Sequence, residues 1–232
     1  MTRPVLPRIS HAALWRLLPF AAFMVVLALR GALPDGGSGA LDNRWLYGLQ
    51  AGAAALLLAL GWRHYQELGT DAWRGLGARG LLLSLAVGAA VWALWIALDA
   101  SWMRLGQPSA VFRPLDADGQ LLWGLIALRA LGATLVVPLM EELFWRSLLL
   151  RWLHGTQYHQ IDPRMVGLRA VLLSSAVFAL AHTEWLAAFI TGVIYAWLYR
   201  RTGSLWAPVI AHAVTNGLLA AWVVLGGHWG YW

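Results

Sequence analysis

The chain has 232 residues, of which 60% are hydrophobic and only 12% are charged. Soluble domains carry about twice that share of charged residues, so the composition excludes an ordinary soluble domain and predicts a membrane protein. The net charge of +6 comes from 17 basic residues that are all arginine, and the chain has no cysteine. In so apolar a chain this charge indicates contact with anionic lipid headgroups rather than nucleic acid. The lack of cysteine excludes disulfides, a thiol nucleophile and cysteine-bound metals.

Seven apolar stretches are predicted to be membrane-spanning helices. A polar, basic segment at 1–13 precedes the first stretch, and no small-residue cleavage site follows it. We therefore expect the first stretch to be retained and not removed as a signal peptide. A glycine-rich turn is expected at 34–39, and a charged connection at 63–79. The expected spans are residues 14–30, 45–62, 80–98, 120–154, 167–182, 185–199 and 204–225.

The fourth stretch, 120–154, is longer than a membrane is thick. At ~1.5 Å per residue it would extend ~50 Å, against ~30 Å for the hydrocarbon core, so it must tilt, kink or protrude. Pro138 predicts a kink. The fold class expected is therefore all-α, a helical bundle of seven spans, or of eight if this stretch is two elements. We expect one membrane domain over 1–232, with N-terminal spans in 1–119 and the catalytic core helices in 120–225.

Arginines are unevenly distributed between alternate connections. One set of connections, including the N-terminal segment, holds 12 arginines and the other set holds 4. The positive-inside rule then places the N-terminus in the cytoplasm and, with seven spans, the C-terminus outside. With an eighth span, the C-terminus would no longer be expected outside.

Three ionisable residues lie together in an otherwise apolar stretch, Val137–Arg146. Each costs about 2.5–3.5 kcal/mol to insert at membrane depth, so their presence needs a reason. Glu142 and Arg146 are four residues apart and can pair along one helix face. Glu141 is rotated by about 100° and points elsewhere, which leaves one carboxylate free for chemistry. The structural alternative is an ion pair beside a second carboxylate without a catalytic role.

Two histidines and an asparagine supply further polar groups. His212 and Asn216 are four apart and project from one side of the last span, and Phe178 and His182 share a face near the end of the fifth. A lone histidine on an apolar helix usually fills a packing role. Two histidines, an asparagine and a glutamate pair in one chain instead indicate a single functional polar site.

Three motifs occur in a fixed order along the chain: Glu141-Glu142-x-x-x-Arg146, Phe178-x-x-x-His182 and His212-x-x-x-Asn216. Together with the run at 201–208, this ordered set resembles the CAAX protease and bacteriocin-processing family. Members are intramembrane glutamate-dependent endopeptidases related to the type II CAAX prenyl endopeptidase. The resemblance covers about residues 120–220. The chain is also similar to a subgroup that accompanies exosortase systems in Gram-negative bacteria.

The resemblance implies a metal-independent hydrolysis without a cofactor, in a bacterial inner membrane, on a peptide or a lipidated C-terminus. A carboxylate would act as general base, and histidine and amide donors would meet the developing oxyanion. It assigns one role to each of six polar residues: general base to Glu141, water holding to His182, oxyanion binding to His212 and Asn216, and support of the site to Glu142 and Arg146.

Three alternatives stay open. Zinc could be held by Glu141, His182 and His212, although the sequence has no His-Glu-x-x-His motif. The same cluster could serve a proton-coupled transporter, or the fold could be a non-catalytic scaffold or immunity protein. The first half of the chain has no matching cluster, which argues against the repeat pair of a transporter. His182 and His212 also approach from opposite sides, so they share a depth only if a helix starts deeper or tilts.

Overall fold

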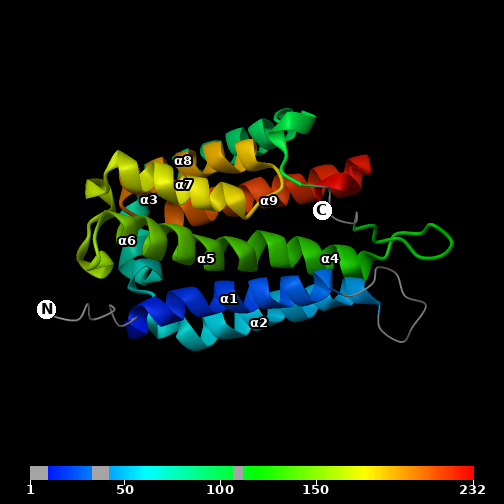
Figure 1. Ribbon diagram of the computed structural model, residues 1–232, viewed down its shortest axis with the longest axis horizontal. Coiled ribbons are helices and arrows are strands. Elements are labelled where there is room, and N and C mark those ends of the chain that lie inside the picture. Colours follow the sequence, from blue (N-terminus) through cyan, green and yellow to red (C-terminus); the bar gives the residue numbers. More distant parts are fainter. Residues whose placement is uncertain (1–9, 33–41, 107–111) are drawn as a thin grey trace, which may run out of the picture.

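The computed structural model describes residues 10–32, 42–106 and 112–232; the turn expected at 34–39 lies outside these ranges. Within them the regular structure is helical, apart from one isolated bridge between Leu115 and Leu121, so the all-α prediction is confirmed. The α-helices of Figure 1 are α1 (His11–Gly31), α2 (Leu46–Gly61), α3 (Thr70–Ala97), α4 (Trp123–Leu131), α5 (Val137–Glu142), α6 (Arg151–His154), α7 (Leu168–Leu180), α8 (Trp185–Thr202) and α9 (Trp206–Gly226).

All seven predicted stretches are helical in this part of the chain, and five are long and apolar enough to cross a membrane. These five are α1, the α2 region, α3, the α4–α6 stretch and α9. Helices α7 and α8 are not among these five, although the sequence predicted a span at each of them. Helix α7 has only 13 residues, whereas α8 has 18. The bundle therefore combines five long helical stretches with a hairpin, α7–α8, whose first helix is short.

Helix α3 begins ten residues before the predicted span, at Thr70. The connection expected at 63–79 is thus partly helical, with a break at Gly77, whose φ of 62° lies in the region that favours glycine. Asp71 and Arg74 are exposed, so the charges that suggested a loop lie on the outside of a helix.

The predicted kink at Pro138 takes another form. Residues 123–154 form one helical stretch in which π-helical segments at 132–136 and 143–150 flank α5. π-segments inside helices are rare and are frequent at functional sites. The stretch is continuous, so the described residues contain seven helical stretches and not eight.

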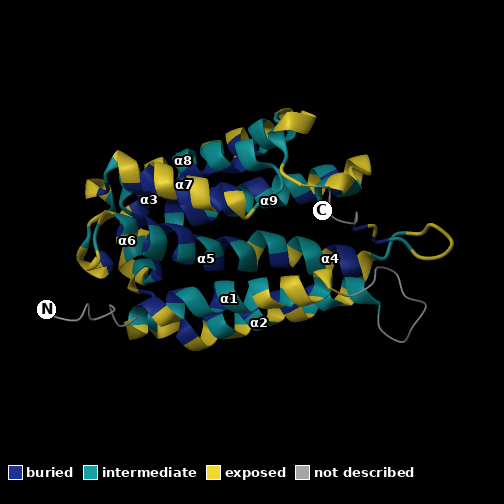
Figure 2. Ribbon diagram, in the orientation of Figure 1, coloured by how far each residue is buried: buried dark blue, intermediate teal, exposed yellow. Residues whose placement is uncertain are grey.

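The long α4–α6 stretch lies between two groups of helices. One group is the pair α1–α2, and the other contains α3, α7, α8 and α9 (Figure 1). Helices α3 and α9 approach closely at Gly88, where an added Cβ would lie 2.4 Å from the carbonyl oxygen of Ala211. Many buried positions lie between the groups, and many exposed positions lie on the outer sides of the helices (Figure 2). The exposed residues include leucines such as Leu82, Leu180 and Leu225, as expected of a lipid-facing surface.

The bundle has two ends, which we call end A and end B. End A holds the start of α1 and the connections α2–α3, α6–α7 and α8–α9; it is at the left in Figure 1. End B holds the α3–α4 and α7–α8 connections and the C-terminus.

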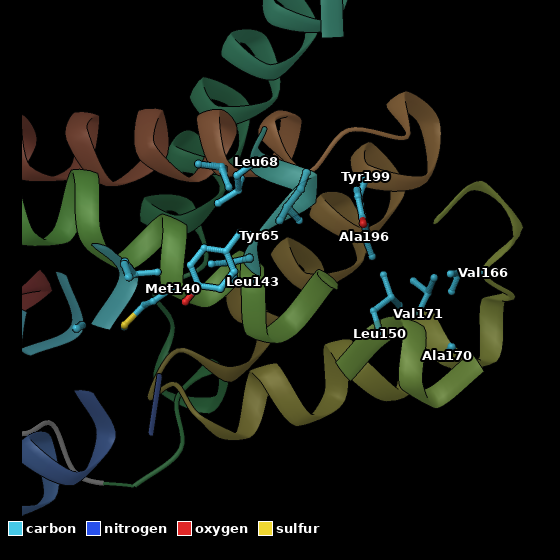
Figure 3. Packing of buried hydrophobic residues seen from close by; sticks show 14 residues of the cluster. Tyr65, Leu68, Met140, Leu143, Leu150, Val166, Ala170, Val171, Ala196 and Tyr199 are labelled. Atoms are coloured by element: carbon cyan, nitrogen blue, oxygen red, sulfur yellow. The ribbon is translucent and has the colours of Figure 1, made fainter. Parts of the chain in front are cut away.

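End A is closed by an apolar cluster (Figure 3). The cluster joins α2, the α2–α3 connection and the long stretch to the end-A halves of α7, α8 and α9. Its fully buried members include Leu143, Leu150, Val166 and Leu205.

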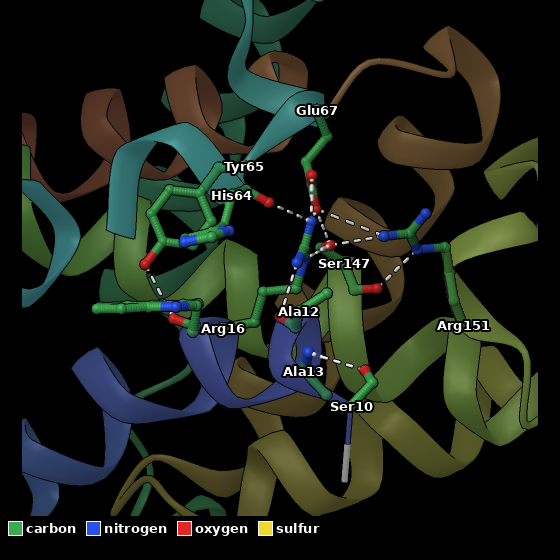
Figure 4. Close-up of polar contacts among 10 residues, drawn as sticks. Ser10, Ala12, Ala13, Arg16, His64, Tyr65, Glu67, Ser147 and Arg151 are labelled. Carbon is green, nitrogen blue, oxygen red and sulfur yellow. Dashed lines mark hydrogen bonds and ion pairs between the residues drawn. The ribbon is translucent and has the colours of Figure 1, made fainter. Parts of the chain in front are cut away.

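A polar clamp fastens the same end (Figure 4). The Arg16 guanidinium donates to both carboxylate oxygens of Glu67, at 2.8 and 2.6 Å, and to Ser147 Oγ at 3.0 Å. Ser147 also donates to Glu67, and Arg151 Nη2 donates to Ser147 Oγ at 2.6 Å. The clamp ties α1 and the α2–α3 connection to the helical segment that starts directly after the glutamate pair.

From the surroundings of Glu67 we expect the folded protein to lose stability in acid. Burial raises its pKa, but the hydrogen bond and charge of Arg16, with the Ser147 bond, outweigh burial and hold the pKa below its usual value. A carboxyl with a lowered folded pKa stabilises fully above its unfolded pKa of about 4.3, and this stability is lost as pH falls through the folded value. In detergent, Glu67→Gln should lower the thermal midpoint at neutral pH and make it less dependent on acid.

The matched control is Asp71→Asn, an exposed carboxylate on the neighbouring helix start. It should leave both the midpoint and its acid dependence near wild type. Parallel acid curves for wild type and Glu67→Gln would contradict the role given to the clamp.

Candidate active site

A cavity of about 230 Å³ lies between α3, α5, α7, α8 and α9, and all four predicted catalytic residues line it: Glu141, His182, His212 and Asn216. The three motifs are thus brought together from positions up to 75 residues apart in the sequence. The rest of the wall is mostly apolar or aromatic and consists of Trp95, Val137, Phe178, Glu184, Thr191, Tyr195, Thr215, Leu219 and Tyr231.

Glu141 presents a carboxylate to this cavity from the end of α5. Its Oε2 atom is buried and has no hydrogen-bonding partner among the described residues. An unsatisfied buried acceptor costs about 1–3 kcal/mol unless water or a ligand meets it. Glu141 is therefore placed to accept a proton from a molecule in the cavity.

Glu142 is fully buried and engaged on both sides. Arg146 Nε lies 3.0 Å from Oε2, so the ion pair expected from the spacing is present. His212 Nδ1 lies 2.9 Å from Oε1, a contact that joins α5 to α9 and that the sequence did not predict. The Arg146 guanidinium also lies 4.8 Å from the ring centre of Phe178 and 5.4 Å from that of Tyr195, so aromatic faces hold it in place.

The contact with Glu142 sets the tautomer of His212. A carboxylate only accepts hydrogen bonds, so Nδ1 carries the proton and Nε2 is the nitrogen left for the cavity. In a neutral ring Nε2 accepts; it donates only when the ring is an imidazolium. The oxyanion-binding role that the resemblance implies for His212 therefore requires a ring that carries both protons.

His182 lies in the turn after α7, whose last residue is Leu180, and not within a helix ending at 182. Its Nδ1 is 2.8 Å from the carbonyl oxygen of Phe178, which only accepts, so Nε2 is again the free nitrogen. The Trp95 ring packs edge-on against it at 5.8 Å. Because α7 is short, its end reaches the level of His212, which answers the question of their common depth.

Asn216 is held by an irregularity of the facing helix. Its Nδ2 donates to the carbonyl oxygen of Ala133 at 2.8 Å. In the π-segment the Val137 N–H bonds to Gly132, and Pro138 has no N–H, so the Ala133 carbonyl lacks a helical donor. Asn216 fills that deficit with one N–H and keeps its second N–H for another acceptor.

The sequence analysis did not predict that side chains of α8 line the cavity. Tyr195 bonds Thr215 Oγ1 through its hydroxyl at 2.7 Å, and Thr191 lines the cavity one turn away. The i, i+4 spacing of Thr191 and Tyr195 on an apolar helix was the available signal. The alternative zinc ligands, Glu141, His182 and His212, face one cavity, but no group of three histidine, aspartate or glutamate side chains in the described ranges is placed to hold a metal ion.

Residues 122–218 match the family described as Type II CAAX prenyl endopeptidase Rce1-like. A "Putative membrane peptidase YdiL" of Bacillus subtilis (strain 168) is 28% identical over 94 residues, which are 39% of this chain and 35% of that protein. The chain therefore spans about a third of the length of the curated relative it matches, and no solved structure matches it. The match covers all four residues of the cavity that we singled out and supports a membrane peptidase. The chain is a multi-pass membrane protein, and its residues 122–218 are similar to the CAAX prenyl endopeptidase family.

Proposed function

We propose that this protein is an intramembrane endopeptidase that hydrolyses a peptide bond with water activated by Glu141, without a metal or cofactor. The observation that carries the proposal is that the two glutamates have different partners. Glu142 has an ion pair with Arg146 and a hydrogen bond with His212, while Glu141 Oε2 faces the cavity without a hydrogen bond or ion pair among the described residues. A base needs that freedom, since it must bind water and then hold its proton.

In the proposed reaction, Glu141 and His182 Nε2 hold a water molecule between them. Glu141 takes one proton of this water as its oxygen adds to the carbonyl carbon of the substrate. The proton then passes from Glu141 to the amide nitrogen, the C–N bond breaks, and a carboxylic acid and an amine leave. No other reactant is needed.

The tetrahedral intermediate carries its charge on the former carbonyl oxygen. We assign its stabilisation to the second N–H of Asn216 and to His212, which donates from Nε2 as an imidazolium. Glu142 at Nδ1 fixes the orientation of the ring. Loss of one such donor typically costs about 2.7–4 kcal/mol in the transition state.

The substrate class proposed is a peptide or a lipidated C-terminus presented at a bacterial inner membrane. The N-terminus would lie in the cytoplasm, lipids would be the surroundings of the bundle, and residues 120–225 would form the catalytic core. A proton-coupled transporter needs access to the polar cluster from both sides. The packed cluster at end A favours the enzyme instead.

The direct test is proteomics of membrane-protein termini in cells that express wild type or Glu141→Gln. New termini should appear with wild type only. The control Asp118→Asn changes an exposed carboxylate at end B and should match wild type. Identical termini in cells with wild type and with Glu141→Gln would refute the proposal.

Metal independence is a separate prediction. Arg146 places a positive charge beside the cavity and engages the second carboxylate, which opposes a divalent cation and favours an oxyanion. We expect the purified protein to stay active in a strong chelator and to contain no stoichiometric zinc by elemental analysis. If chelation abolishes cleavage and zinc alone restores it, Glu141, His182 and His212 are metal ligands.

A further inference from the structure

The cavity is not centred between the two ends of the bundle. Trp95 is two residues from the last residue of α3, Glu184 lies in the α7–α8 connection, and Tyr231 is next to the C-terminal residue. All three are at end B. The cavity thus runs from mid-bundle, at Glu141, to the connections of one end.

Among the described residues, packed side chains close the other end. Immediately beyond the glutamate pair, Leu143 and Leu150 are fully buried in the apolar cluster of Figure 3. At the same level the Arg16–Glu67–Ser147 clamp of Figure 4 joins α1, the α2–α3 connection and the long stretch. A substrate that approached from end A would have to break both the packing and a buried ion pair.

The two ends also differ in charge. Within the described ranges end A carries nine arginines and three acidic residues, and end B carries five of each. The residues of end A are Arg16, Arg63, Glu67, Asp71, Arg74, Arg79, Arg151, Asp162, Arg164, Arg169, Arg200 and Arg201. Those of end B are Arg30, Asp42, Arg44, Asp99, Arg104, Arg113, Asp116, Asp118, Arg129 and Glu184. The excess of arginine, which sets orientation in membranes, is at end A.

End A is closed and rich in arginine, which indicates the cytoplasmic side, and the cavity reaches end B. We therefore propose that the cavity opens to the non-cytoplasmic face of the membrane. The substrate is then a polypeptide segment that has been translocated, or that reaches the outer half of the bilayer. In this orientation, a lipidated C-terminus that stays in the cytoplasm would not reach the cavity. The choice of substrate rests on the proposed function, whereas the orientation does not.

The cysteine-free sequence makes the orientation testable by single-cysteine labelling. Glu184→Cys marks the mouth of the cavity and Leu219→Cys its wall. Asp118→Cys marks end B and Gln157→Cys marks end A, both at exposed positions. The probe is a membrane-impermeant maleimide added to sealed right-side-out vesicles, and to inside-out vesicles in parallel.

In right-side-out vesicles we expect modification of Glu184→Cys and Asp118→Cys, with Gln157→Cys modified only in inside-out vesicles. Leu219→Cys should follow Glu184→Cys. The proposal is overturned if Glu184→Cys follows Gln157→Cys or is modified from neither side. Repeating the labelling with Glu141→Gln added separates the two questions, because an inactive or non-catalytic protein gives the same labelling pattern.

Discussion

Glu141→Gln should abolish proteolysis and leave the fold intact. Glutamine keeps the shape of the side chain but cannot take a proton from water, and a positioned general base contributes about 10²–10⁴-fold to rate. Because Glu141 Oε2 has no partner among the described residues, the substitution breaks no hydrogen bond seen in the structure. We expect turnover of a substrate found by terminal proteomics to fall by at least about 100-fold, at an unchanged thermal midpoint.

Glu184→Gln is the matched control, since Glu184 is the other carboxylate among the cavity-lining residues. It should retain most of the activity, which would show that the effect belongs to one carboxylate and not to the charge of the cavity. Retention of most wild-type turnover by purified Glu141→Gln would remove Glu141 from the mechanism.

The sequence predicted the helices well where apolar composition and helix length coincide. At α7 and α3 a helix was also predicted, but its length or its start differs from the prediction. Apolar residues continue to Ala181, so nothing in the composition marks the end of α7 at Leu180. The first turns of α3 carry charges on an exposed face. Their low hydropathy led to the prediction of a loop, although a helix forms there.

For the site, the sequence predicted contacts within one helix better than contacts between helices. The Glu142–Arg146 pair follows from a spacing of four residues. The Glu142–His212 contact joins residues 70 positions apart and depends on how α5 packs against α9. The Asn216–Ala133 bond needs a π-segment followed by proline, and only the facing helix shows which side chain fills the missing donor.

Arg146→Ala should destabilise the protein as well as inactivate it. The side chains of Arg146 and Glu142 are 3% and 0% exposed, so the substitution leaves a carboxylate buried with His212 as its remaining partner. Breaking a buried pair in this way typically costs about 3–5 kcal/mol. The rings of Phe178 and Tyr195 also lose the guanidinium between them. The measurement is the thermal midpoint of the purified protein in detergent.

The double variant Glu142→Gln with Arg146→Met separates a lost charge balance from lost packing. Methionine refills the space between the rings, and the glutamine oxygen can still accept from His212 Nδ1, so no buried charge is left without a partner. Its midpoint should recover most of the loss seen in Arg146→Ala. Activity should stay low, because the substitutions remove the carboxylate that holds His212 at Nδ1 and the guanidinium beside the cavity. Equal midpoints for wild type and Arg146→Ala would show that the pair does not hold the site together.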